Sequence, residues 1–169
     1  MAESPAALRL SGILASYGRF HRDPRNRLTH CFGVPVIVYA VLIPLALHSG
    51  TLSGVSLRLD RVVVALAAVA YIVLDVSLGL ALTLALGILG AAAEATCILV
   101  GPSPALAVAA TAFLLGWALQ LIGHRLEGNR PALLTNLAQI FVAPLFLAAE
   151  LGFSLGLRRR LRSDVERQL

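Results

Sequence analysis

The stretch HRDPRNRLTHCFGVP, residues 21–35, marks the change from a polar leader to a long apolar run. It contains two of the four histidines of the chain and three of its fourteen basic residues, all of which are arginine. Asp23 followed by Pro24 is a typical helix start, because aspartate caps free N–H groups and proline fits the first helical turn. No residue is charged from Cys31 to Leu47. The sequence therefore predicts a long helix that begins at residue 24 and runs into an apolar environment.

Composition identifies that environment as a lipid bilayer. Of the 169 residues, 58% are hydrophobic and 14% are charged, and the mean hydropathy is +0.83. Soluble domains contain only about 45–50% apolar residues. We therefore predict a single integral membrane domain over residues 1–169, with an all-α fold that forms a polytopic helical bundle.

The arginines lie mainly at the two ends of the chain, ten of them in residues 1–30 and 158–169. Near membrane segments such clusters favour the anionic cytoplasmic face of a bilayer. They do not predict nucleic-acid binding, because no soluble fold is available to carry a basic patch. The bilayer itself is the expected partner.

Hydrophobic periodicity predicts an N-terminal amphipathic helix at residues 5–20, where Leu10, Leu14 and Tyr17 share one face. Such a helix either lies on the membrane surface or packs against the bundle. Between Val62 and Gly123 the only charged residues are Asp75 and Glu94. We expect about four to five hydrophobic helices, at residues 24–48, 61–78, 80–100, 104–123 and 132–157.

Charge distribution constrains the last of these helices. If the N-terminus is cytoplasmic, four crossings return the chain to the cytoplasm at His124, the side that carries His21 and His30. A fifth full crossing would place the arginines that follow Leu157 outside, against the positive-inside tendency. Either the segment 132–157 is broken or re-entrant near Pro144, or one of the earlier crossings is assigned wrongly.

A second polar island, GHRLEGNRP at residues 123–131, supplies a third histidine. His30 lies about 10 Å along the predicted helix from its start, so His21 can share a ligand with it only if residues 21–23 fold back. Pro24 favours that fold-back, since it disfavours helical geometry in the preceding residue. Three histidines at one membrane face predict a metal site for Fe, Zn, Cu or Ni. The alternative is that each is a structural histidine at the membrane edge.

Several other polar residues accompany these histidines. Trp117, Gln120, His124 and Glu127 follow at helical spacing on one face. Glu127 either orients His124, binds the metal directly or pairs with Arg130.

His48 is either a fourth metal ligand, brought back by a re-entrant first hydrophobic segment, or an exposed loop residue. The carboxylates of Asp75 and Glu94 lie in apolar segments, where an isolated charge is costly. We therefore expect Asp75 near a turn, while Glu94 is either a proton or metal ligand or faces the bundle interior.

These residues resemble a known family. The resemblance covers about residues 10–155, and its two polar motifs are similar to those of the fungal 2-hydroxy fatty acid dioxygenase and its bacterial homologues. The matching positions are Tyr17, Phe20, His21, Pro24, Asn26, His30, Pro35, Trp117, Gln120, Gly123, His124, Glu127, Pro131, Ala132, Leu133, Asn136, Ala143 and Pro144.

The resemblance implies a non-haem Fe(II) enzyme that uses O₂ to shorten a long-chain 2-hydroxy fatty acid by one carbon. It implies a location in the endoplasmic reticulum, or in the inner membrane if the chain is bacterial. The metal site would lie at the cytoplasmic face. The family histidines fall on His21, His30 and His124. The expected catalytic set is these three with Glu127, and the expected substrate-binding set is Asn26, Trp117, Gln120, Arg125 and Arg130.

Two other functions remain open at this stage. A small membrane transporter would use Asp75 and Glu94 as an intramembrane pathway and would need no metal. A haem-binding membrane protein would use two of the histidines as axial ligands.

Overall fold

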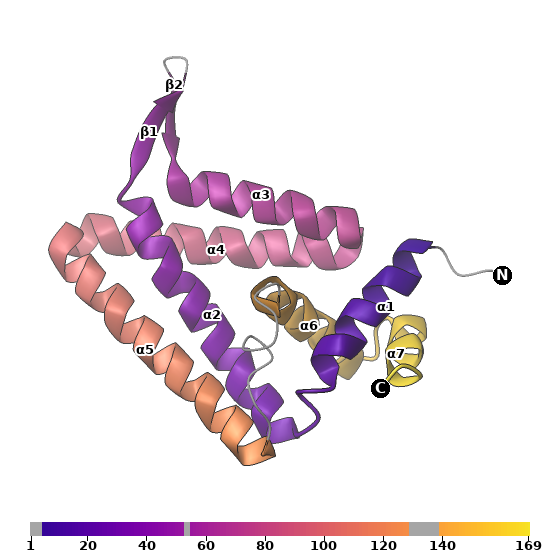
Figure 1. Cartoon of the computed structure of the whole chain (residues 1–169). Helices are drawn as coiled ribbons and strands as arrows, with labels where there is room; N and C mark the ends of the chain where they lie inside the picture. Colours follow the sequence, from indigo (N-terminus) through magenta and orange to yellow (C-terminus); the bar gives the residue numbers. More distant parts are fainter. Residues whose placement is uncertain (1–4, 53–54, 129–138) are drawn as a thin grey trace.

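The computed structural model describes residues 5–52, 55–128 and 139–169. Within these ranges the chain forms seven helices and one antiparallel two-stranded hairpin (Figure 1). The predicted all-α class is confirmed, and the hairpin between α2 and α3 is an addition to it. The elements are α1 (Pro5–Gly18), α2 (Pro24–Ala46), β1 (Ser49–Leu52), β2 (Val55–Arg58), α3 (Leu59–Leu74), α4 (Val76–Val100), α5 (Pro102–Glu127), α6 (Gln139–Ser154) and α7 (Arg159–Glu166).

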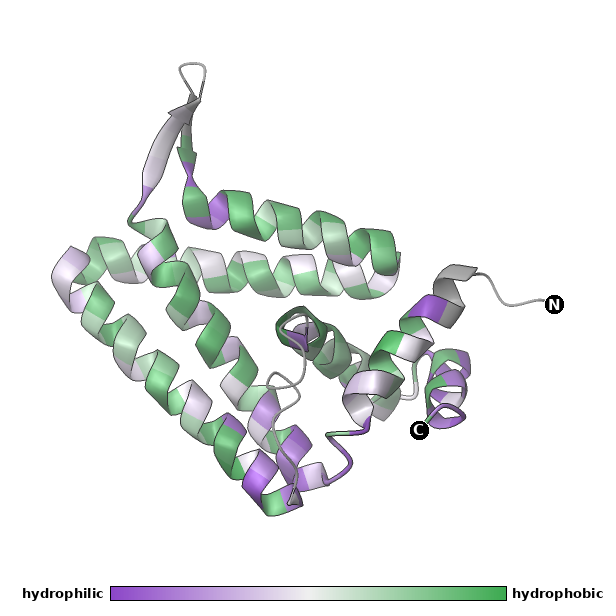
Figure 2. Ribbon diagram, viewed as in Figure 1, coloured by the Kyte–Doolittle hydropathy of each residue, from purple (hydrophilic) through white to green (hydrophobic). Residues whose placement is uncertain are grey.

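Three of the described helices, α2, α4 and α5, are long and apolar enough to cross a membrane. Helix α3 has 16 residues, fewer than the roughly 20 that span a hydrocarbon core. Helices α6 and α7 meet at 117° and together qualify as one bent span. Figure 2 shows that hydrophilic residues gather where α2 begins and α5 ends, and along α7.

Helix α2 begins as its sequence predicts. Asp23 is the N-cap, and its carboxylate accepts the backbone N–H of Arg25 at 2.7 Å. Pro35 and Pro44 both lie inside the helix without ending it. The helix stops at Ala46, two residues before the expected end.

The other apolar helices differ from the expected ranges at their ends. The segment expected at 61–78 ends at Leu74, because the Asp75 side chain accepts the N–H of Leu78 and starts α4. The segment expected at 132–157 is described only from residue 139, and Pro144 lies inside α6. The chain turns after Ser154 instead, where Gly156 and Arg158 both adopt positive φ.

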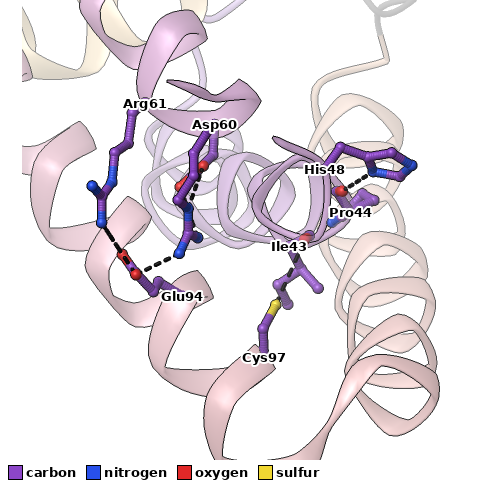
Figure 3. A network of polar contacts seen from close by, with 8 residues as sticks. Ile43, Pro44, His48, Asp60, Arg61, Glu94 and Cys97 are labelled. Atoms are coloured by element: carbon purple, nitrogen blue, oxygen red, sulfur yellow. Dashed lines mark hydrogen bonds and ion pairs between the residues drawn. The ribbon is translucent and has the colours of Figure 1, made fainter. Parts of the chain in front are cut away.

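The two membrane carboxylates are both ion-paired. Asp75 binds the guanidinium of Arg158. Glu94 binds Arg58 and Arg61, the latter at 3.0 Å, at the base of the hairpin (Figure 3). Asp75 therefore lies at a turn as expected, and Glu94 pairs with one arginine at the end of β2 and one in the first turn of α3.

Helices α2 and α5 pack along each other through glycines. A Cβ atom on Gly33 would lie 3.0 Å from the carbonyl oxygen of Gly116, and one on Gly116 would lie 2.6 Å from Cγ1 of Ile37. A Cβ on Gly123 would overlap with Asn26 and Thr29. Because small residues let helix backbones approach closely in membranes, this contact brings the two polar islands of the sequence to the same end of the pair.

Helix α1 packs against the bundle. Its residues Leu10, Leu14 and Tyr17 are buried in a core with α6 and α7. This core also holds Leu161 of α7, so both ends of the chain meet there (Figure 1). Of the two interpretations of the amphipathic stripe, packing on the bundle is the one the structure shows.

Candidate metal centre

Three histidines from different parts of the chain converge at the end of the α2–α5 pair. His21 lies in the link between α1 and α2, His30 on α2 and His124 on α5, and one nitrogen from each lies within 4.8 Å of the others. Their exposed fractions are 2%, 3% and 4% respectively. Among the described residues, no carboxylate or cysteine joins this group.

Glu127 explains why the link that carries His21 folds back over α2. Its Oε1 atom accepts the backbone N–H of Arg22 at 2.5 Å and that of Asp23 at 3.2 Å. Its Oε2 atom accepts the side-chain N–H of Asn26. One carboxylate at the end of α5 thus satisfies three donors around the start of α2, and His21 is held beside His30.

Backbone carbonyls fix the tautomers of two of the histidines. The Nδ1–H of His21 donates to the carbonyl oxygen of Tyr17, and that of His30 to the carbonyl oxygen of Asn26, each at 2.9 Å. In the neutral rings the Nε2 atoms then carry lone pairs, and these two atoms lie 3.1 Å apart. Two lone pairs at this distance repel unless a proton or a cation lies between them.

The nitrogen set fits a transition-metal ion. Two nitrogens bound to one ion at about 2.0–2.1 Å each are roughly 3 Å apart when the angle between the bonds is near 100°. His124 adds an Nδ1 atom that is buried and has no hydrogen-bond partner among the described residues. Metal-binding histidines typically donate their second N–H to a carbonyl or carboxylate, as His21 and His30 do here.

The surroundings of His21 keep its ring neutral. Burial lowers the pKa of His21 to about 4, against the opposing effect of its hydrogen bond to Tyr17. The ring of Tyr17 stacks on it with centroids 4.0 Å apart. Since only the neutral ring binds a metal, the site stays competent for binding at physiological pH.

An apolar cavity of about 240 Å³ begins at the histidines and lies between α2, α5 and α6. Two of the predicted substrate-binding residues, Trp117 and Gln120, are part of its wall. Both amide atoms of Gln120 are buried without a hydrogen-bond partner in the described part of the chain. The complete lining is Tyr17, His30, Val34, Ile37, Val38, Val41, Phe113, Trp117, Gln120, His124, Gln139, Ile140 and Ala143.

Other predicted site residues lie outside this cavity. Asn26 is buried, and it contacts Glu127 and the Phe20 carbonyl instead. Arg125 is exposed, and Arg130 lies outside the described residues. His48 is also exposed, at the opposite end of α2, where its ring contacts the Pro44 carbonyl (Figure 3). Eighteen residues of chain separate it from His30, or about 27 Å along a helix, so the structure does not bring it to the cluster.

The structure adds residues that sequence reasoning missed. Gln139 lines the cavity, and its Oε1 atom is buried without a partner among the described residues. No sequence pattern distinguishes this glutamine. The stacking of Tyr17 on His21 could have been predicted from the sequence, because Tyr17 lies four residues, or about one helical turn, before His21.

Two alternative functions find little support in this arrangement. A transport pathway needs free carboxylates, but Asp75 and Glu94 are paired with arginines. A haem lies between its axial ligands, but the facing Nε2 atoms of His21 and His30 are 3.1 Å apart. The fold and site together define a small membrane-type helical protein with a buried three-histidine centre beside an apolar cavity.

Comparison with known proteins identifies the family of the chain. The family model described as "2-hydroxy-palmitic acid dioxygenase Mpo1-like" matches residues 8–155. The chain is 32% identical over 164 residues to the 2-hydroxy-palmitic acid dioxygenase MPO1 of Saccharomyces cerevisiae, which covers 96% of this chain and 90% of the yeast protein. The chain belongs to the Mpo1-like family. No solved structure gives a significant match.

Proposed function

We propose that this protein is an Fe(II)-dependent dioxygenase that converts a 2-hydroxy fatty acid to the fatty acid one carbon shorter. The observation that carries the proposal is the pair of facing Nε2 atoms of His21 and His30, which lie 3.1 Å apart beside an apolar cavity that His30 and His124 line. The relation to a 2-hydroxy-palmitic acid dioxygenase supports the substrate class.

In this proposal His21, His30 and His124 hold the ion. Ferrous iron, when bound, supplies the activation of O₂, which protein side chains do not provide. The carbonyls of Tyr17 and Asn26 hold two of the rings in the tautomer that leaves Nε2 free. Glu127 acts as a positioning residue, because the hydrogen bonds that it accepts come from the backbone of residues 22 and 23 and from the side chain of Asn26.

The cavity binds the substrate and excludes water. Gln120 has an unpartnered amide that matches the carboxylate or the 2-hydroxyl group of the acid, and Trp117 contacts the apolar chain. In the overall change C2 becomes the new carboxyl carbon and C1 leaves as CO₂, while O₂ is reduced to the level of water. One O₂ per substrate balances the electrons, so the reaction needs no additional reductant.

The proposed location of the site is the cytoplasmic edge of the membrane. Arginines surround the start of α2 at residues 22, 25 and 27, and Arg125 lies on the last turn of α5. Such a concentration is typical of cytoplasmic membrane edges. The membrane would be the bacterial inner membrane, or the endoplasmic reticulum in a eukaryote.

The test is a reconstituted reaction. The protein is purified in detergent without oxygen, loaded with Fe(II), and supplied with 2-hydroxypalmitate and O₂. We expect about one iron per chain and the formation of pentadecanoate that depends on both iron and O₂. Turnover by iron-free protein, or full activity of His30→Ala, would overturn the proposal. His48→Ala is the matched control and should behave as wild type.

A further inference from the structure

The cavity beside the histidines has two unlike ends. Along α2 its wall runs from His30 to Val41, and along α5 it runs from His124 back to Phe113. Each stretch contains twelve residues, and its eleven helical steps correspond to about 16 Å. Helix α2 runs away from the histidines and α5 runs toward them, and both helices give the same length for the cavity.

The exposed fraction of the lining residues rises from the histidine end of α2 and α5 toward the other end. Gln120, one turn from His124, is 6% exposed. At the other end Val41 of α2 and Phe113 of α5 are 44% and 40% exposed. On α6, the third wall of the cavity, the lining residue Ile140 is 53% exposed. Because α2 and α5 are membrane-spanning in length and composition, the surface exposed there faces lipid.

The closed end requires a polar ligand. Gln120 has a buried donor and a buried acceptor without partners among the described residues. Buried amides are normally satisfied. A carboxylic acid with a neighbouring hydroxyl group offers both donors and acceptors, whereas the rest of the cavity is lined by apolar side chains.

The axis of the cavity matches the orientation of a fatty acid in a leaflet. The histidines lie where α2 begins and α5 ends, at the polar edge of the helix pair (Figure 2). A mouth about 16 Å away lies near the bilayer midplane, since the hydrocarbon core is about 30 Å thick. A fatty acid in a leaflet likewise holds its head group at the edge and its tail toward the midplane.

We propose that the cavity opens sideways to the bilayer between Val41, Phe113 and Ile140, and that a fatty acid enters through this opening without turning over. Its head group reaches Gln120 and the histidines, and the part of its tail beyond the opening stays in lipid. This inference deepens the proposed function and rests on it for the identity of the head group. It also predicts that long chains are accepted without an upper length limit.

Trp117 offers a direct readout, because it lines the cavity and is the single tryptophan of the chain. The protein, without added metal, is placed in phosphatidylcholine vesicles and titrated with a 2-hydroxy fatty acid that carries bromine on its chain. Bromine quenches tryptophan fluorescence at contact. We expect saturable quenching that an unbrominated 2-hydroxy acid reverses. Vesicles with brominated phospholipid give the background from bulk lipid.

Two variants test the opening. The double variant Val41→Phe with Ile140→Phe fills the mouth, and both side chains are exposed on the protein surface, so the fold should tolerate it. We expect the half-quenching concentration to rise about tenfold, which corresponds to about 1.4 kcal/mol of binding free energy. Val108→Phe is the control, because Val108 is an exposed valine of α5 that does not line the cavity. Phe113→Ala widens the mouth and should speed the onset of quenching.

The outcomes separate this inference from the proposed function. Unchanged quenching in the double variant, or an equal loss in Val108→Phe, would overturn the lateral opening. If longer 2-hydroxy acids competed much less well, the lateral opening would also be overturned, because that result would show that the cavity is closed where the tail should leave it. The fluorescence needs neither iron nor turnover. A protein that binds the acid through this opening but never converts it would therefore refute only the enzymatic proposal.

Discussion

Glu127 accepts the backbone N–H of Arg22 across 105 residues of chain. The same carboxylate accepts the N–H of Asp23 and the side chain of Asn26. Through these bonds the end of α5 determines where His21 lies. A residue that accepts no hydrogen bond from the three histidines can therefore control whether they meet.

Replacing Glu127 should weaken metal binding indirectly. In Glu127→Ala three donors lose their acceptor and the link that carries His21 is released. Changes in the supporting contacts of metal ligands typically weaken metal affinity by about 10–100-fold, and we expect a loss in this range, measured by Fe(II) titration. Hydrogen exchange at residues 21–23 should rise at the same time. Glu166→Ala removes an exposed carboxylate paired with Arg162 and should change neither measurement.

The three histidines should behave as one unit. His21→Ala, His30→Ala and His124→Ala are each expected to reduce bound iron from about one equivalent to near zero in elemental analysis, because each removes one of three nitrogens. Retention of stoichiometric iron by any one of them would remove that residue from the ligand set.

Gly33 should tolerate no side chain. A Cβ there would lie 2.5 Å from the side-chain nitrogen of Gln120 and 3.0 Å from the Gly116 carbonyl oxygen. We expect Gly33→Ala to lower the free energy of unfolding by about 1–3 kcal/mol, the usual effect of overpacking. Gly87→Ala is the matched control in α4, where nothing lies within 4 Å, and should be neutral or stabilising by about 0.5–1 kcal/mol. Thermal unfolding in detergent compares the two, and equal effects would contradict the close packing of α2 on α5.

The contact between Asp75 and Arg158 should make stability depend on pH. Burial raises the pKa of Asp75, but the Arg158 guanidinium and the Leu78 N–H outweigh it, so the pKa lies below its ordinary value. A lowered pKa adds stability that is fully present above the pKa of the unfolded chain, about 3.9, and is lost as the pH falls through the folded-state value. For a partly exposed pair we expect about 1 kcal/mol or less.

Variants at Asp75 separate its two roles. Asp75→Asn keeps an oxygen that can accept the Leu78 N–H and loses only the ion pair. Asp75→Ala loses the helix cap as well, at a further cost of about 0.5–2 kcal/mol. The difference in unfolding free energy between wild type and Asp75→Asn should therefore become smaller as the pH falls from 7 to 3, whereas Asp75→Ala should stay less stable than both at either pH. A constant gap between wild type and Asp75→Asn at both values would contradict the role of the ion pair.

Local signals in the sequence were sufficient for the existence of the long apolar helices and for the all-α class, but not for the hairpin or for α7. Asp23 and Pro24 predict the start of α2, and Gly101 with Pro102 predicts the break before α5, because caps and breakers act on their immediate neighbours. The long apolar runs predict a membrane bundle, because the hydropathy of each segment can be read without knowing the rest of the fold. The two polar islands could also be recognised as candidate halves of one site.

Only the tertiary structure decided how these parts meet. The position of His21 depends on Glu127, which lies more than a hundred residues away, and the approach of α2 to α5 depends on Gly33 facing Gly116. Gln139 becomes a cavity residue only because α6 packs against α2. Hydropathy and capping report what each segment prefers, whereas a site built from three helices and a link requires contacts between side chains that no local preference specifies.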